Sequence, residues 1–347
     1  FLDHRLTLGL DLFERNTTDM IGPSEQKPGV LGVSVPSTNN ASLQTRGWEL
    51  ELGWKQRVSN DLSYGVNLNI YDNHTKITKY NNPNNLIDSW YVGKVAGEIW
   101  GYESNGLFQS EEEIENHASQ SHIYGNWRPG DVKYEDLNGD GRINEGNRTL
   151  DNHGDLKIIG NRSSRYQFGI SGNISYRGFD FSMLWRGVGK RDLDHHLTGY
   201  GSQAYFGFLT QTWSAINDIH LDYYRDQPGD KYTGLYEGDK NINLDAWLPR
   251  PYLSSVENPK NRQVSTRYLL NGAFMRLQYV QIGYNLPERA ISRLGLSKVR
   301  MHLTGDNLLT FSHMPKGVDP VAVTGFYTLG TTYGVGRGFT FGLTVQY

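Results

Sequence analysis

The chain has 347 residues, no cysteine, 40 glycines, 12% aromatic residues and a formal net charge of −3. The missing cysteines exclude disulfides and thiolate chemistry, and the small negative charge gives no support for nucleic-acid binding. No run of about 18 apolar residues is present, which excludes a transmembrane helix but not membrane-crossing strands, because these alternate and average to a polar composition. The chain starts at Phe1 with neither Met nor a signal peptide, so we expect a piece of a longer protein.

About eight segments alternate apolar and polar residues, the pattern of strands with one apolar face. In chain order the segments are 6–12, 48–54, 62–70, 168–176, 179–185, 280–286, 299–303 and 339–347. A strand of ~10 residues crosses a membrane when it is tilted. The pattern therefore predicts an all-β chain whose strands are long enough to span a bilayer.

The polar faces of these segments carry mostly Gly, Ser, Thr and Asn, whereas the outer face of a soluble sandwich is rich in Lys and Glu. Aromatic residues stand near the ends of several segments: Trp48, Trp54, Tyr166, Tyr176, Tyr284 and Tyr347. Rings at both edges of an apolar band are typical of outer-membrane barrels. A large soluble β-sandwich with an aromatic core is the alternative.

The predicted connections alternate between short and long. The long ones are 16–42, 80–164, 190–270 and 311–336, and the short ones are 56–61, 176–179 and 286–298. The last of these should hold a small helix, with Pro287 at its first turn and Gly295 past its end. Short periplasmic turns and long extracellular loops are the arrangement of outer-membrane barrels, and loops this long are usually functional.

Several stretches, in this order, resemble the C-terminal part of a SusC/RagA-type TonB-dependent outer-membrane transporter. They are "TRGWELELGWK" (45–55), "EIWGYESNGLFQSEEEI" (98–114), "RPGDVKYEDLNGDGRINEGNRTL" (128–150), "IIGNRSSRYQFGISGNISYRGFDFSMLWRG" (158–187), "STRYLLNGAFMRLQYVQIGYNLP" (265–287), "LTGDNLLTFS" (303–312) and "GFTFGLTVQY" (338–347). Together they cover most of the chain from about residue 45 onward.

The resemblance implies that residues 1–347 are the C-terminal strands, about eight, of a large antiparallel transmembrane β-barrel of ~22 strands. It implies long extracellular loops at 80–164 and 190–270, and a plug and N-terminal strands outside this chain. Unpaired sheet edges cannot persist in lipid, so the first strand must pair with absent material and the last strand should close the barrel. It further implies TonB-energised import of a large nutrient, with a SusD-like surface lipoprotein as a lid and a location in the outer membrane of a Bacteroidetes-type Gram-negative cell.

The stretch "DLNGDGRINEGN" (136–147) has the oxygen-rich pattern of a calcium loop. Its candidate ligands are Asp136, Asn138, Asp140, the carbonyl of Arg142, Asn144 and Asn147. Gly141 permits the sharp turn and Ile143 should anchor the loop. The pattern asks for a bidentate Glu at the position of Asn147, for which Glu145, Asp151 or Asp155 could substitute. We expect a structural Ca²⁺ rather than a sensor; the alternative is an Asx-rich turn that holds itself without metal.

No catalytic motif stands out, and we expect no enzyme. His195 and His196 are adjacent, so their side chains should point apart, and the acidic run after Ser110 is typical of a helix N-terminus. The glycine-rich run 330–336 precedes a strand rather than a helix, which argues against a phosphate-binding loop.

Exposed aromatic residues of the long loops could stack on sugar rings. The candidate substrate contacts are Trp127, Trp213, Trp247 and Tyr223, although for any single ring packing of the loops on each other and on the lipoprotein lid is the better interpretation. Tyr347 is an interface aromatic, and a terminal aromatic of this kind also resembles the signal that the barrel assembly machinery recognises.

The leading interpretation is TonB-dependent import of an oligosaccharide, with a peptide importer of the same type as the second. The competing interpretation from another class is a secreted, calcium-stabilised glycan-binding β-protein without transport. A surface glycosidase needs two positioned carboxylates, which the sequence offers no means of pairing.

Overall fold

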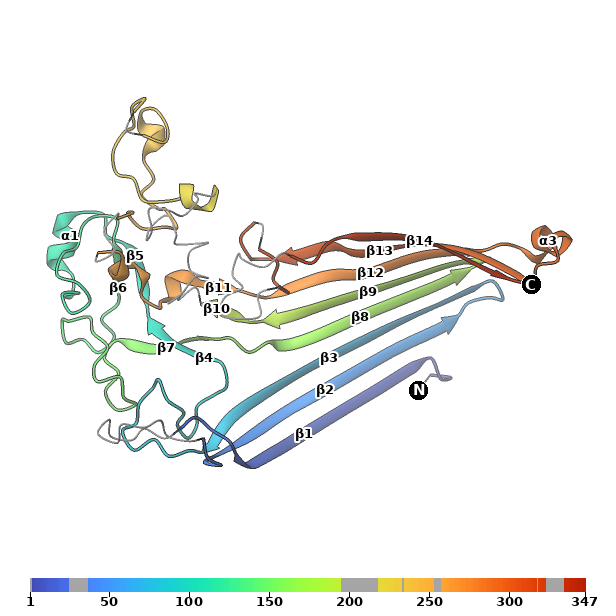
Figure 1. Cartoon of the computed structure of the whole chain (residues 1–347), viewed down its shortest axis with the longest axis horizontal. Coiled ribbons are helices and arrows are strands. Elements are labelled where there is room, and N and C mark those ends of the chain that lie inside the picture. The colour runs from blue at the N-terminus through green and yellow to red at the C-terminus, as the bar shows by residue number, and fades with distance from the viewer. Residues whose placement is uncertain are drawn as a thin grey trace.

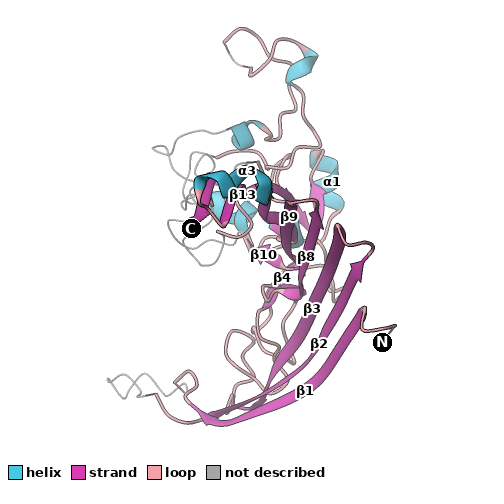
Figure 2. Cartoon of the chain, turned by 90° about the vertical axis from the view of Figure 1, so that its right-hand side faces the viewer, coloured by secondary structure: helices cyan, strands magenta, loops and turns pink. Residues whose placement is uncertain are grey.

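The computed structural model describes residues 2–24, 37–194, 218–232, 234–252, 257–316, 318–322 and 334–347. Its centre is one curved sheet of eight antiparallel strands (Figures 1 and 2). The strands are β1 (Leu6–Met20), β2 (Ala41–Arg57), β3 (Leu62–Lys79), β8 (Arg165–Tyr176), β9 (Phe179–Lys190), β12 (Phe274–Asn285), β13 (Lys298–Ser312) and β14 (Gly338–Gln346). They lie in chain order, so each predicted alternating segment is a strand of this sheet.

The first three strands are longer than the predicted ~10 residues: β1 has 15, β2 has 17 and β3 has 18. β1 runs to Met20 and β2 starts at Ala41, so the predicted connection 16–42 was too wide at both ends. The apolar alternation ends earlier because the outer part of β1 is polar, while its ladder with β2 continues to Thr17 and Met20. Backbone pairing thus extends beyond the apolar band.

Short turns join the strands at one end of the sheet. Arg177 and Gly178 both have positive φ, 46° and 87°, as the tight two-residue turn between β8 and β9 requires. At the same end, α3 (Glu288–Ile291) and the 3₁₀ turn η7 (Ser292–Leu294) precede Gly295, whose φ is 68°. The small helix expected between Pro287 and Gly295 is therefore confirmed.

The sheet has one apolar face. One row across it runs through Ile174, Phe181, Ile282, Leu303 and Phe341, which are register partners on successive strands. Four of them are markedly exposed, from 46% for Ile174 to 67% for Phe341. Exposing such a continuous apolar surface to water is unfavourable. A surface of this extent therefore indicates contact with lipid or with another apolar partner.

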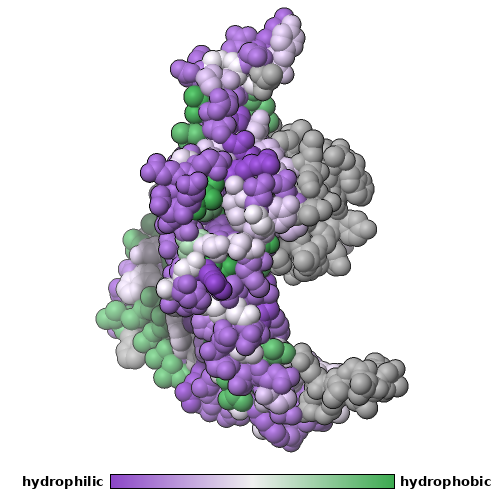
Figure 3. Space-filling model, turned by 90° about the vertical axis from the view of Figure 1, so that its left-hand side faces the viewer, coloured by the Kyte–Doolittle hydropathy of each residue, from purple (hydrophilic) through white to green (hydrophobic). Residues whose placement is uncertain are grey.

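The other end of the sheet carries the long connections, which build a second layer of structure (Figure 1). Viewed from this end, the surface is mostly hydrophilic (Figure 3). It contains the strand pairs β4 (Glu98–Tyr102) with β7 (Leu156–Asn161), β5 (Ser104–Leu107) with β6 (Val132–Tyr134), and β10 (Asp192–Asp194) with β11 (Leu269–Asn271). Its helical turns are α1 (Glu111–Asn116), η3 (Asp218–Leu221), η4 (Asp239–Asn241), η5 (Asn258–Arg262) and η6 (Thr266–Tyr268). Ser110 caps α1 by accepting from the N–H of Glu113, as its acidic first turn predicts.

The main hydrophobic core lies in this loop layer and not under the sheet. We call it the interloop core, and it comprises Ile87, Tyr102, Leu107, Val132, Tyr134, Ile143, Leu156, Tyr224, Ala246, Leu248, Tyr268 and Met314. All of its residues except Met314 come from the two connections 80–164 and 190–270, so these two loops share one core. Among the described residues, no helix is both long and apolar enough to cross a membrane.

Candidate functional site

The predicted calcium loop is a chain of side-chain-to-backbone turns. Asp136 accepts from the N–H groups of Gly139 (2.7 Å) and Gly141 (2.8 Å). Asn138 accepts from the N–H of Asp140, and Asp140 from that of Arg142. Ile143 is fully buried in the interloop core, as expected for the residue that anchors the loop.

Two features of the loop bear on whether it can hold a metal ion. Asn147 is exposed, and the buried Asp155 already accepts from the N–H groups of Leu137 and Asn144, both at 2.8 Å. In the part of the chain that the structure describes, no three His, Asp or Glu side chains converge as a metal site. Calcium would therefore need the amide oxygens of Asn138 and Asn144 and a backbone carbonyl, which are oxygen ligands that it accepts.

The N–H donors also act on charge. Partial desolvation alone would raise the pKa of Asp136, but the hydrogen bonds from Gly141 and Gly139 outweigh it and hold that pKa below its usual value. The carboxylate is thus kept ionised, the form in which it can bind a cation.

A buried ion pair that the sequence did not indicate lies at the centre of the loop layer. Lys260 Nζ is 2.7 Å from Asp131 Oδ2, and both side chains are fully buried. Asp131 also accepts from the hydroxyl of Tyr252 (2.8 Å) and the amide of Asn261 (2.7 Å), as well as from the N–H of Arg128 (2.8 Å). The carboxylate is fully hydrogen-bonded, which is the condition for burying it.

The surroundings of Lys260 complete this arrangement. Its ammonium donates to the carbonyl of Asn126 (2.9 Å) and lies 4.2 Å from the centre of the Tyr252 ring. The rings of Tyr124 and Trp127 lie 5.5 Å away. Asp131 lies in the first long loop (80–164), whereas Lys260 lies on η5 in the second (190–270). The pair therefore ties the two loops together.

Of the four residues predicted to contact substrate, three lie at the interloop core. Trp127 donates from Nε1 to the carbonyl of Tyr124 (2.7 Å), and Trp247 meets Tyr268 edge to face at 6.0 Å. Tyr223 packs on the same core beneath Arg225, whose guanidinium is 4.6 Å from its ring centre. Trp213 lies outside the described residues, as do His195 and His196. The contacts explain the three rings as packing groups, and their part in substrate binding stays a prediction.

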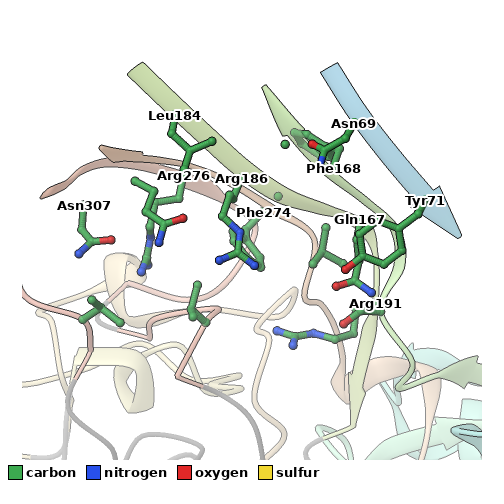
Figure 4. Close-up of a pocket in the computed structure, with 17 residues that line it drawn as sticks. Asn69, Tyr71, Gln167, Phe168, Leu184, Arg186, Arg191, Phe274, Arg276 and Asn307 are labelled. Atoms are coloured by element: carbon green, nitrogen blue, oxygen red, sulfur yellow. The ribbon is translucent and has the colours of Figure 1, made fainter. Parts of the chain in front are cut away.

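A separate cavity of about 650 Å³, the lumen pocket, opens on the polar face of the sheet (Figure 4). Its lining residues are Asn69, Tyr71, Ser164, Gln167, Phe168, Gly169, Leu184, Arg186, Gly187, Val188, Arg191, Phe274, Arg276, Gln278, Asn307, Val321 and Val335. They come from β3, β8, β9, β12 and β13 and from the adjoining connections, which supply Ser164, Arg191, Val321 and Val335. Gly169 provides room, because a Cβ there would meet the Asn69 amide oxygen at 2.4 Å.

The lumen pocket contains three arginines and no carboxylate among the residues that line it. Arg276 Nη2 is 2.5 Å from Asp319 Oδ1, so its charge is compensated. Arg191 donates to the carbonyl of Pro320 (2.5 Å), but its Nε is buried without a hydrogen-bond partner, and so is Gln278 Oε1. Burial lowers the pKa of Arg191, because no carboxylate offsets its desolvation.

The sequence carried one signal for this pocket. Arg186 follows Trp185 in the alternation of β9 and so stands on the polar face, where its register partners are Gly169 and Arg276. Arg191 is positioned by β10 and β11, because its carbonyl accepts from the N–H of Gly272 (2.7 Å) just beyond that hairpin. Only the fold brings these arginines to one cavity.

A curved sheet of eight sequential antiparallel strands, apolar on one face and polar on the other, with short turns at one end and long loops at the other, is the fold of part of a TonB-dependent transporter barrel. The solved structure of the RagAB peptide transporter superposes on 99% of this chain with a TM-score of 0.67 and 15% sequence identity, using 34% of its own chain. A RagAB peptide importer in the closed-closed state gives a TM-score of 0.66 at 16% identity, over 99% of this chain and 34% of its own.

The sequence comparisons give the same class of protein. TonB-dependent receptor P3 of Formosa agariphila is 27% identical over 336 residues, 92% of this chain and 29% of the receptor. TonB-dependent receptor SusC of Bacteroides thetaiotaomicron is 22% identical over 358 residues, 100% of this chain and 31% of SusC. The chain thus spans about a third of the length of these curated relatives, and no family model matches it. The resemblance to SusC/RagA-type transporters is confirmed, and these relatives are receptors and transporters rather than enzymes.

Proposed function

We propose that this chain is the C-terminal wall of a TonB-dependent outer-membrane importer for a large nutrient. The observation that carries the proposal is the apolar face of the sheet, whose exposed row from Ile174 to Phe341 a bilayer would cover. β1 and β14 each have one neighbour among the described strands, which fits a sheet that closes through strands from a preceding part of the protein. In this proposal the loop layer faces the outside of the cell.

The proposed nutrient is an oligosaccharide, with a peptide as the second candidate. The relative SusC is a TonB-dependent receptor, and its name does not state a nutrient. The solved structures with the same fold are described as peptide transporters, which is why a peptide stays the second candidate. The proposed partners are a SusD-like surface lipoprotein over the loop layer, TonB at the N-terminal part, outer-membrane lipid, and the barrel assembly machinery at Tyr347. Nucleic acid is not a proposed partner.

The experiment is an uptake assay in cells that carry or lack the gene for the whole protein. We expect the deletion to abolish growth on one nutrient of an oligosaccharide and peptide panel, and a proton uncoupler to abolish its uptake in the intact strain. Uptake that continues in the deletion strain would contradict import by this protein. A protein that stays monodisperse without detergent would favour the secreted glycan-binding alternative.

Within this function we propose a structural role for calcium. Bound to the Asp136–Asn147 loop, the ion would fix a segment whose Ile143 and Asp155 already anchor it to the interloop core. Ion pairs beside the loop also restrain it: Arg148 pairs with Asp88 (2.6 Å) and with Glu145 (2.5 Å). Because Glu145 is paired with Arg148, we do not count it among the proposed calcium ligands.

A further inference from the structure

We propose that the lumen pocket binds a carboxylate group of the imported nutrient through Arg186 and Arg191. This inference rests on the proposed import function and narrows its substrate class. It starts from the uncompensated charge of the pocket: two arginines without an ion-pair partner face a cavity that has no carboxylate among its described lining residues.

The stretches 195–217 and 323–333, which adjoin β10 and the approach to β14, contain no Asp or Glu. Nearby carboxylates are already used: Asp319 pairs with Arg276, and Asp192 Oδ2 accepts from the N–H of Asn161 (2.9 Å). Among the described residues, no carboxylate therefore stands free at this pocket for Arg186 or Arg191.

The geometry suits a planar anion. Figure 4 shows Arg186 and Arg276 extending from neighbouring strands into the same cavity, and Arg191 reaching it from beyond the end of β9. A guanidinium presents a rigid fork of N–H donors that matches the two oxygens of a carboxylate. Nε of Arg191 is buried without a partner, and its Nη2 donates to the carbonyl of Pro320, so the guanidinium is held at the pocket by a neutral group.

The remaining lining fits the rest of a polar nutrient. Asn69, Gln167 and Asn307 offer amide donors and acceptors, and Gln278 Oε1 is a buried acceptor without a partner. Tyr71 and Phe274 add ring surface beside them. Few polar groups placed among apolar and aromatic surface is the usual composition of a ligand site.

The position of the pocket favours the nutrient over a second occupant. The pocket is lined by residues of β8, β9 and β12 and by Arg191, Val321 and Val335 of the adjoining connections, so a molecule that enters from the loop side reaches it before the short-turn end of the sheet. The competing occupant is an acidic side chain of the plug in the whole protein. That occupant would make the two arginines structural and indifferent to the charge of the nutrient.

The test is calorimetry on the full-length transporter in complex with its lipoprotein, with two matched probe pairs. One pair is an oligogalacturonate and its methyl ester, and the other is an acidic peptide and its amidated, neutral form. We expect one anionic probe to bind, and Arg186→Gln with Arg191→Gln to weaken it about tenfold or more, as for the loss of charge-assisted hydrogen bonds. Arg186→Lys with Arg191→Lys should restore part of that affinity, and Arg177→Gln, at an exposed turn on the opposite end, should change nothing.

Three outcomes overturn the inference. They are binding of the anionic probe that does not depend on the two arginines, no binding of either anionic probe, and equal weakening of anionic and neutral probes together with faster proteolysis of the plug. The last outcome assigns the arginines to the plug. Uptake by the intact strain distinguishes failure of this inference from failure of the proposed import function. If the strain still imports a neutral nutrient, the import function stands and only the proposed preference for an anionic nutrient is wrong.

Discussion

Lys260 and Asp131 form an ion pair with a Nζ–Oδ2 distance of 2.7 Å, and neither side chain is exposed to solvent. The pair joins the two long loops, whose adjacent residues Val132 and Asn261 are separated by 129 positions in the chain. Around them, Asn261 accepts from the N–H of Val132, and Tyr134 donates to the carbonyl of Lys260 (2.8 Å). The loop layer therefore depends on a polar network as well as on the interloop core.

Replacing Lys260 by Met should destabilise the loop layer by about 3–5 kcal/mol, because Asp131 is left as a buried, uncompensated charge. Hydrogen exchange of β5, β6 and η5 measures the effect, and the eight-stranded sheet should keep its protection. The double variant Lys260→Met with Asp131→Asn removes both charges and should recover a large part of the loss. Protection in the single variant equal to that of the wild type would contradict the role given to this pair.

Replacing Asp140 by Ala should loosen loop 80–164 without altering the barrel, if calcium bridges the loop as proposed. Hydrogen exchange with calcium and with chelator checks this, and the difference between the two conditions should vanish in the variant. Glu115→Ala is a matched control, because Glu115 is exposed on α1 and belongs to none of the candidate ligand sets. Equal protection with and without chelator in the wild type would count against bound calcium.

The calcium loop should also respond to acid. The pKa of Asp136 is lower in the folded chain than in the unfolded one, where it is about 3.9. Its stabilising contribution is therefore present above about pH 4 and is lost as the pH falls through the folded value. Exchange protection of Gly139 and Gly141, measured down to that range, should fall in the wild type. Asp136→Asn should remove this pH dependence, and an unchanged profile would assign it to other groups.

The sequence predicts the sheet because its information is local. Alternation in segments such as 168–176 and 179–185 places each residue on one face without knowledge of its neighbours. The turn at Arg177 and Gly178 follows from local preferences too. The outer extensions of β1 and β2 were missed, since they carry no apolar alternation and exist through pairing with each other.

The sites depend on contacts that no local pattern contains. Ile143 and the Asx turns of the calcium loop follow from one motif, whereas Asp131 finds Lys260 only when both loops have folded. Trp127 and Trp247 were predicted as ring surfaces for substrate, yet their neighbours show them packed at the interloop core. The role proposed for Arg186 and Arg191 depends on the lack of a carboxylate among the described residues that line the pocket, which only the folded structure shows.

Deleting Tyr347 should lower the amount of full-length protein in the outer membrane. The side chain is fully exposed in this structure and makes no packing contribution whose loss would unfold β14. Its expected role lies in recognition by the barrel assembly machinery. Quantitative immunoblots of membrane fractions measure the level, with Tyr347→Phe as the variant that keeps an aromatic terminus. Normal levels of the deletion variant would remove the assembly role.

The apolar face of the sheet provides the most direct test of the proposed location in the outer membrane. Phe341 is 67% exposed on the apolar face of β14, while Thr340, the preceding residue, is also exposed but stands on the other face. Phe341→Arg should destabilise the barrel by about 2–4 kcal/mol if the position lies near the middle of the bilayer. Thr340→Arg should be tolerated, because the lumen face is polar. The amount of folded, heat-modifiable protein in outer-membrane fractions compares the two variants. If both arginines are tolerated equally, the face that carries Phe341 does not contact hydrocarbon, and the barrel orientation proposed for this chain is wrong.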